Sequence, residues 1–210
     1  MPLVAVPDTC VLFPASLRDA IFLAASAQVF RMRLTDDILD ELNRNLPLYL
    51  VKKGRTPEAA SEATGRLLTK IREAFDEAII DNHKKLIDKM PVNAKDRHVM
   101  AAAVASSAQI IVTQNLKDFP KHLLEHHNIK AQSPDDFLTD LFYDNTEGMI
   151  NVIIKQSWNL RNPPHSVSEV LDTLKLHAPI FSNLIRRGLD LMTDYERPVH
   201  VEVNSDTSQR

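Results

Sequence analysis

Apolar positions follow two different periods along the first 140 residues of the chain. Residues 3–6 and 109–113 are short apolar runs bounded by polar or turn residues, a pattern typical of buried strands. Two longer stretches favour helices: residues 16–29 are rich in Ala, Leu and Ile, and residues 96–107 are rich in Ala. Strands that alternate with helices predict an α/β fold: a central parallel sheet with helices on both faces, in three α/β/α layers.

Helix-start signals divide the rest of this region. Ser and Thr side chains cap helix N-termini, and Pro suits the first helical position. The predicted N-caps are Ser16, Thr35, Thr56 and Ser133. The helix after Thr56 is expected to reach about residue 80, and residues 29–34 and 129–131 are candidate strands. Residues 115–119 are expected to form a loop at the end of the 109–113 strand.

Beyond residue 144 no strong strand pattern appears before the tail. Residues 149–160 and 179–191 each have a helical pattern, and between them Ser166 and Glu169 have the spacing of a capping box. Trp158 and Phe181 are interpreted as core residues of these helices. We therefore expect a domain over residues 1–144, a helical extension over 145–197, and a polar tail over 198–210 that is disordered at its end.

Composition limits the class of protein. No apolar run approaches the roughly 20 residues that a membrane span needs. The N-terminus, MPLVAVPD, lacks the basic region of a signal peptide, and the single cysteine, Cys10, excludes an intrachain disulfide. A cytoplasmic protein without membrane partners is expected. The net charge of −3 argues against an unspecific nucleic-acid binder, although it is compatible with a nuclease that has local basic patches.

Four acidic residues stand where such a fold gathers functional groups. Asp8 ends the first predicted strand, Asp118 follows the strand at 109–113, and Glu41 and Asp96 lie on the adjoining helices. Ligands of open α/β sheets bind at the carboxyl ends of the strands. Four carboxylates there would repel one another unless a divalent cation offsets their charge, and Mg²⁺ prefers oxygen ligands. Such a site suits phosphodiester hydrolysis. Taken singly, each acid also fits an ordinary turn, helix-start or solvent-facing position.

Three stretches together resemble the PIN-domain family. They are VPDTCVLFP at 6–14, ILDELNRNL at 38–46 and KDRHVMAAAVASSAQIIVTQNLKDFP at 95–120, and the combined pattern covers about residues 3–140. The resemblance implies that Asp8, Asp96 and Asp118 ligate Mg²⁺ or Mn²⁺. It implies Glu41 as a further ligand or outer-shell base, Asn115 as a group that orients water or an acid, and Thr113 as a supporting hydroxyl.

Two further features resemble one subgroup of VapC-type toxins, the Arg-His-Val after Asp96 and the helical extension with Asn-Pro-Pro at 162–164. The resemblance implies a metal-dependent endoribonuclease, the toxin of a type II toxin–antitoxin pair, that acts on RNA such as tRNA and is silenced by a cognate antitoxin protein. A homodimer is also compatible with it. Residues 92–95 lack the extra acids of that subgroup. Lys95 there would either weaken ion binding or contact phosphate.

Basic residues supply candidate RNA contacts. Lys52, Lys53 and Arg55 cluster at the end of the Glu41 helix, where they either bind the RNA backbone or are simply solvated. Arg44 stands one turn after Glu41 and would reach a phosphate or pair with Glu41 itself. His98 would orient a phosphate, pack, or support the site from behind.

Other functions remain open at the sequence level. The chain could be a PIN nuclease that acts on DNA or processes RNA without a toxin role, or a PIN-shaped binding module without activity. His122, Glu125 and His126 match the H-x-x-E-H zinc-hydrolase pattern as a remote alternative, but a short surface helix with polar His and buried Leu123 and Leu124 is favoured. Cys10 could be a nucleophile paired with His98, or a small buried side chain.

Overall fold

A parallel four-stranded sheet forms the centre of the computed structural model, which describes residues 3–161 and 163–191. Its strands are β1 (Val4–Pro7), β2 (Arg31–Met32), β3 (Ile110–Val112) and β4 (Lys130–Gln132), in the order β2-β1-β3-β4. Ala5 of β1 pairs with Met32 on one side and Ile110 on the other. All four strands therefore point their carboxyl ends to the same edge, which is where Asp8 follows β1.

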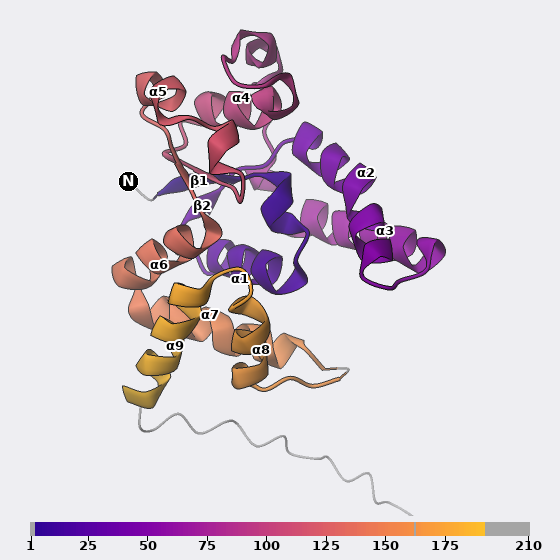
Figure 1. Cartoon of the computed structure of the whole chain (residues 1–210), viewed down its shortest axis with the longest axis vertical. Coiled ribbons are helices and arrows are strands. Elements are labelled where there is room, and N and C mark those ends of the chain that lie inside the picture. The colour runs from indigo at the N-terminus through magenta and orange to yellow at the C-terminus, as the bar shows by residue number, and fades with distance from the viewer. Residues whose placement is uncertain (1–2, 162, 192–210) are drawn as a thin grey trace, which may run out of the picture.

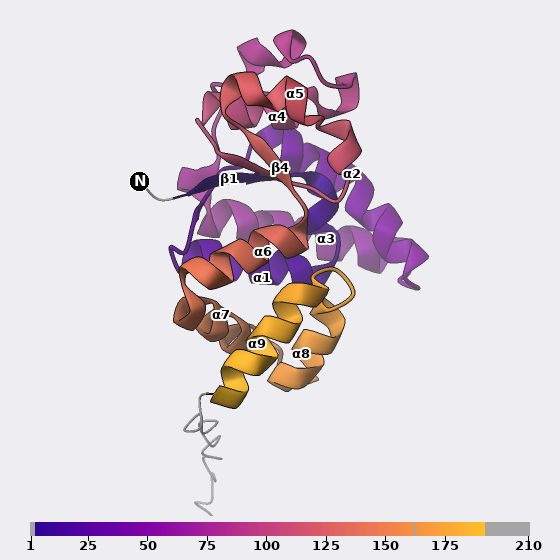
Figure 2. The ribbon, with the colours of Figure 1, turned by 60° about the vertical axis from the view of Figure 1, so that its left-hand side comes forward.

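Helices cover both faces of the sheet. The helices of the first 144 residues are α1 (Ala15–Ser26), α2 (Asp36–Lys52), α3 (Pro57–Ala74), α4 (Arg97–Ala105), α5 (Lys121–Leu124) and α6 (Pro134–Asp144). Figures 1 and 2 show α4 and α5 on one side of the sheet and α1 and α6 on the other, with α2 and α3 beside one another at its flank. The expected three-layer α/β/α arrangement is confirmed.

The short 3₁₀ turns of the chain mark the ends of its strands and helices. They are η1 (Thr9–Leu12), η2 (Asp76–Ala78), η3 (Lys84–Lys89), η4 (Ala94–Asp96), η5 (Leu116–Asp118) and η6 (Glu125–His127). Two of them directly follow a strand of the sheet or its loop: η1 follows β1, and η5 follows β3. The loop predicted after the second apolar run is therefore a single tight turn that contains Asp118.

Most helix starts agree with the sequence. Thr35 caps α2 through the backbone N–H of Ile38, and Thr56 and Ser133 cap α3 and α6 in the same way. Ser16 does not cap α1, because Pro14 occupies the N-cap position and the helix already begins at Ala15. The predicted end of α3 near residue 80 is also wrong. The helix stops at Ala74 because the chain then returns to the sheet, where Ile79 forms a parallel bridge with Leu34.

The C-terminal extension consists of α7 (Thr146–Asn159), α8 (Val167–Leu174) and α9 (Pro179–Leu191), and the described parts of residues 145–191 contain no strand. The capping box of Ser166 and Glu169 opens α8 as expected. Phe181 is fully buried, but Trp158 is 45% exposed, so its assignment to the core is wrong. The core-facing side of α7 is formed by Ile153, Ile154 and Ser157, and Trp158 lies outside it. The predicted polar tail lies outside the described residues.

Candidate active site

Asp8 is held at the end of β1 by hydrogen bonds from neighbouring polar groups. Its Oδ2 accepts a bond from the Thr113 hydroxyl at 2.7 Å and one from the Cys10 thiol at 3.0 Å. The backbone N–H of Asn115 in turn donates to the Thr113 hydroxyl at 3.0 Å. Thr113 follows β3, so the network ties together the carboxyl ends of two adjacent strands. Only 7% of Asp8 is exposed, and the bonds fix which of its oxygens is engaged and which remains available.

Asp96 and Asp118 share one cation, the ammonium group of Lys95. Lys95 Nζ lies 2.8 Å from Asp118 Oδ2 and 3.6 Å from Asp96 Oδ2. Asp96 is 9% exposed, and its Oδ2 is buried without a hydrogen-bond partner among the described residues. Burial raises the pKa of the Asp96 carboxyl, the Lys95 charge opposes this, and the charges of Asp118 and Asp8 raise the pKa further. The net rise shows that the surroundings compensate the negative charge of Asp96 incompletely.

Glu41 joins this region from α2 through His98 of α4. Its Oε2 accepts a hydrogen bond from the Thr9 hydroxyl at 2.8 Å and lies 3.1 Å from His98 Nε2. Burial by itself raises the pKa of the Glu41 carboxyl, but the bonds to His98 and Thr9 outweigh burial and the net direction is downward. Burial lowers the pKa of His98, and the bond to Glu41 reverses this, so that the net direction is upward. Both shifts favour an ionised Glu41 and a protonated His98, so the contact is an ion pair when His98 carries its second proton.

The carboxylates of Asp8, Asp96 and Asp118 offer oxygen ligands to a divalent cation. The oxygens are of the hard type that Mg²⁺ and Mn²⁺ prefer. The buried Oδ2 of Asp96, which has no hydrogen bond among the described residues, and a carboxylate charge that Lys95 offsets only in part fit a divalent cation as a further partner. Within residues 3–161 and 163–191, however, no three His, Cys, Asp or Glu side chains stand close enough to enclose an ion. Lys95 Nζ lies between two of the acids, and because its side chain is 59% exposed, it is free to move aside.

The remaining predicted site residues lie at different distances from this centre. The side chain of Asn115 is exposed and makes no hydrogen bond within the described part of the chain, so only its backbone takes part. Arg44 is exposed, and its charge is the smallest of the influences that lower the pKa of Glu41. Lys52, Lys53 and Arg55 lie farther along, where α2 ends and Gly54 adopts a φ of +93°, a conformation that side chains disfavour.

Two residues of the network were not predicted in their roles, Thr9 as a donor to Glu41 and Lys95 as a partner of two acids. Thr9 directly follows Asp8, and a hydroxyl beside a candidate ligand is the one sequence signal that points to it. Cys10 was expected to be a nucleophile or a small buried group. The pKa of the Cys10 thiol is raised to about 12, first by burial, then by the charge of Asp8 and by the hydrogen bond to Asp8. The thiol is therefore protonated at neutral pH and donates to Asp8, and His98 contacts Glu41 instead of Cys10.

The H-x-x-E-H residues do not form a common site. The helix α5 ends at Leu124, so Glu125 and His126 lie in the following turn η6, and the helical spacing of the pattern is lost. His122, Glu125 and His126 are all exposed, and Glu125 pairs with Lys121 at 3.2 Å. As expected for a surface helix, Leu124 is buried in the core, and Leu123 is partly buried and packs against it.

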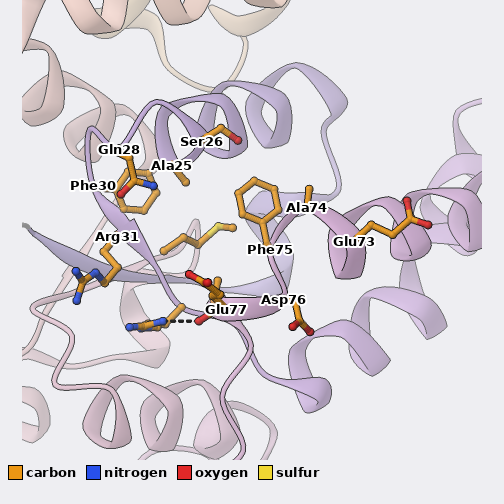
Figure 3. A pocket seen from close by; sticks show the side chains of 13 residues that line it. Ala25, Ser26, Gln28, Phe30, Arg31, Glu73, Ala74, Phe75, Asp76 and Glu77 are labelled. Atoms are coloured by element: carbon orange, nitrogen blue, oxygen red, sulfur yellow. Dashed lines mark hydrogen bonds between the residues drawn. The ribbon is translucent and has the colours of Figure 1, made fainter.

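A separate pocket of about 590 Å³ lies at the β2 edge of the sheet, between the end of α1 and the turn after α3. Figure 3 shows Phe30 and Phe75 lining it, with Arg31 and Glu77 on the β2 side, and a dashed line marks the bond from the Arg33 guanidinium to the Glu77 carbonyl at 2.7 Å. None of Asp8, Glu41, Asp96 and Asp118 lines this pocket. It is thus distinct from the acidic site.

The fold and the acidic site together define a class of protein: the chain belongs to the PIN-domain family, whose model matches residues 4–117. A second family model, described as the VapC50 C-terminal domain, matches residues 134–187. The chain therefore combines a PIN domain with a helical extension that is similar to the VapC50 C-terminal domain. The second match begins with α6, which packs against α7 and α9.

One named relative is similar to this chain in sequence. The chain is 41% identical over 105 residues to "Putative ribonuclease VapC50" of Mycobacterium tuberculosis (strain ATCC 25618 / H37Rv). The aligned part is 50% of this chain and 62% of the relative, so the similarity spans less than two thirds of that protein. No solved structure matches the chain. No described helix is long and apolar enough to cross a membrane.

Proposed function

We propose that this chain is an endoribonuclease that uses Mg²⁺ or Mn²⁺ to hydrolyse RNA phosphodiester bonds. The observation that carries the proposal is that the charges of Asp8 and Asp118, which follow β1 and β3, act on the carboxyl of Asp96, whose buried Oδ2 has no hydrogen-bond partner among the described residues. RNA is the favoured substrate class because the relative from Mycobacterium tuberculosis is named a ribonuclease.

The site residues divide the work as follows. Asp8, Asp96 and Asp118 would hold the metal, which supplies an activated water and stabilises negative charge on the phosphate oxygens. Thr113 and Cys10 orient Asp8 through their hydrogen bonds. Lys95 leaves the two aspartates and its ammonium then pairs with a substrate phosphate. Glu41 stays ionised beside His98, and its carboxylate accepts a proton from the attacking water.

We further propose that the protein is the toxin of a toxin–antitoxin pair. Lys95 illustrates how inhibition would work, since a single ammonium group bridges Asp96 and Asp118. A guanidinium pairs with carboxylates more extensively than an ammonium because it presents a planar fork of donors. An antitoxin would therefore place an Arg or Lys between these carboxylates and compete with the metal.

The test is direct. Purified protein is incubated with Mn²⁺ and total cellular RNA, and separately with DNA, with a chelator as the control. Cleavage of RNA that the chelator abolishes is expected; cleavage of DNA alone would show that the substrate is wrong. Absence of cleavage on both would favour an inactive binding module. Growth of cells that express the chain, with and without the neighbouring gene, tests the toxin role separately.

A further inference from the structure

A pocket of about 340 Å³ lies where the C-terminal extension meets α1 and α2 of the PIN domain. We call it the extension pocket, and the residues that line it include Ser16, Asp19, Tyr49, Lys53, Gln156 and His177. These come from α1, the end of α2, α7 and the turn after α8. Figures 1 and 2 show α7 and α8 beside α1, so the pocket exists only because the extension packs there.

We propose that the extension pocket binds one nucleotide of a single-stranded stretch of the RNA substrate, with the base inside and the phosphate at Lys53. The proposal rests on the ribonuclease function proposed above. It assigns the extension a role in substrate binding in addition to its role in packing.

The first observation is an unsatisfied acceptor in the pocket wall. Gln156 is 2% exposed, and its Nε2 donates to the Ser16 carbonyl at 2.9 Å. Its Oε1 is buried and has no hydrogen-bond partner within the described residues. A buried acceptor without a donor is costly. If the amide turns toward the pocket, a ring N–H or exocyclic amine of a base would supply that donor, and a phosphodiester, which has no N–H or O–H, would not.

The second observation is an aromatic ring in the same wall. Tyr49 stacks on Phe13 with 5.8 Å between ring centroids and 24° between ring planes. Phe13 directly follows η1, so the contact links Tyr49 to the segment that begins at Asp8. Bases stack on such rings without strong sequence preference, and proteins that bind single strands use this contact widely.

The third observation is the positive charge at the pocket. Lys53 Nζ lies 5.7 Å from the Tyr49 ring centroid, and Lys52 and Arg55 flank it in the chain. The Lys53 charge also acts on His177, whose pKa is lowered by burial and then by Lys53. The one acid in the lining is Asp19, whose Oδ1 lies 3.5 Å from Arg18 Nε. No described acid pairs with Lys53, whose ammonium lies over the Tyr49 ring and would turn to the phosphate when a base stacks there. Arg18 offsets the charge of Asp19 only in part, because burial still raises the pKa of the Asp19 carboxyl.

The position of the pocket suits a strand that continues from the acidic site. Glu41 and Tyr49 lie eight residues apart on α2, about 12 Å at the helical rise of about 1.5 Å per residue. A few nucleotides span such a distance. We favour RNA over a protein segment because the unsatisfied amide, the aromatic ring and the cation together match a nucleotide.

A filling variant tests the proposal. Thr173 is an exposed residue of the lining, so Thr173→Trp should fill the pocket without disturbing the core. Thr69→Trp makes the same change at an exposed position of α3 that does not line the pocket. Binding of a short, fluorescently labelled single-stranded RNA of mixed sequence is measured by anisotropy, with a chelator present. Thr173→Trp should weaken binding roughly 10-fold, the value of one stacked base, and Thr69→Trp should not change it.

A second variant keeps the test valid if Thr173→Trp does not fold. Lys53→Ala should weaken binding and lower the salt dependence by about one phosphate contact, and circular dichroism should show that all variants are folded. If folded Thr173→Trp binds the RNA as tightly as wild type, the proposal is overturned. This holds even if the same variant no longer binds a protein partner, which would make the pocket a protein-binding site. If the wild type cleaves RNA and Thr173→Trp binds it normally, only the pocket assignment fails. If the wild type neither binds nor cleaves RNA, the proposed function fails as well.

Discussion

The acidic site and the last two helices of the C-terminal extension, α8 and α9, satisfy their groups to very different degrees. In the site, Asp96 keeps a buried oxygen without a hydrogen bond, and its pKa is raised by burial despite the nearby charge of Lys95. In the extension, Phe181 and Ile185 are fully buried, and both halves of the capping box are formed. Stability is distributed accordingly: the extension supports the fold, and the site retains charge that a ligand would neutralise. Exceptions to local satisfaction are expected at functional sites.

The largest effect should come from the well-packed side of this comparison. Phe181→Ala should lower the free energy of unfolding by about 3–5 kcal/mol, because it removes a large side chain from a fully buried position. Ile180→Ala is the matched control, since Ile180 is 54% exposed and its loss should cost less than about 0.5 kcal/mol. Denaturant unfolding measures both. Equal midpoints for the two variants would mean that Phe181 does not support the packing of the extension.

Smaller changes in the free energy of unfolding, of opposite sign, should result from replacing Asp8 and Asp96 in the site. Asp8→Asn weakens the bonds from Thr113 and Cys10 and should lower the free energy of unfolding by about 1 kcal/mol. Asp96→Asn should raise it in metal-free protein at pH 7. Because the pKa of Asp96 is raised in the folded state, its ionised form costs stability above that pKa, and the cost fades below its ordinary value of 3.8.

Thermal unfolding of the two variants with a chelator, at pH 7 and again near pH 4, checks both signs. The advantage of Asp96→Asn should shrink at the lower pH, which approaches the ordinary value of 3.8, because the wild-type carboxyl is then increasingly protonated in both states. A loss of stability in Asp96→Asn at pH 7 would mean that Lys95 compensates this carboxylate fully, and that the site carries no uncompensated charge.

The smallest effect concerns the pair of Glu41 and His98. The lowered pKa of Glu41 gives stability above its ordinary value of 4.5, which is lost as the pH falls through the lowered pKa. The raised pKa of His98 gives stability below its ordinary value of 6.5, which is lost as the pH rises through the raised pKa. The destabilisation caused by Glu41→Gln should therefore be greatest between pH 4.5 and 6.5.

The control for this profile is Glu73→Gln, a change of the same kind at an exposed position of α3. Thermal unfolding across the pH range should show a bell-shaped loss for Glu41→Gln and a flat profile for Glu73→Gln. A flat profile for both would indicate that the contact between Glu41 and His98 contributes no ion-pair stability.

The sequence predicted those features that depend on neighbouring residues. The apolar runs that became β1 and β3 and the caps at Thr35, Thr56 and Ser133 are local signals, and the structure confirms them. The early end of α3 was not predictable, because it results from pairing between Ile79 and Leu34, which lie far apart in sequence.

The contacts of the candidate site could not be predicted from the sequence either, because they join residues that lie far apart along the chain. Asp8, Asp96 and Asp118 could be proposed from strand ends and family resemblance, but not the bond from Thr9 to Glu41 or the bridge from Lys95 to Asp118. Both join residues more than twenty positions apart. The exposure of Trp158 depends on the direction of its side chain. Its apolar character suggested the core, but its position on α7 leaves it 45% exposed. The catalytic role of each site residue stays a prediction.

Calorimetric titration of metal-free protein with Mn²⁺ tests most directly whether the acids form a metal site. The account predicts that Asp8→Asn and Asp96→Asn each weaken Mn²⁺ binding by more than the roughly 10–100-fold that loss of a supporting group costs. Lys95→Met should tighten it, because the competing ammonium is gone. Asp88→Asn, at an exposed position of η3, should bind as wild type does. Wild-type Mn²⁺ affinity in both Asp8→Asn and Asp96→Asn would contradict the assignment of a metal site to these carboxylates.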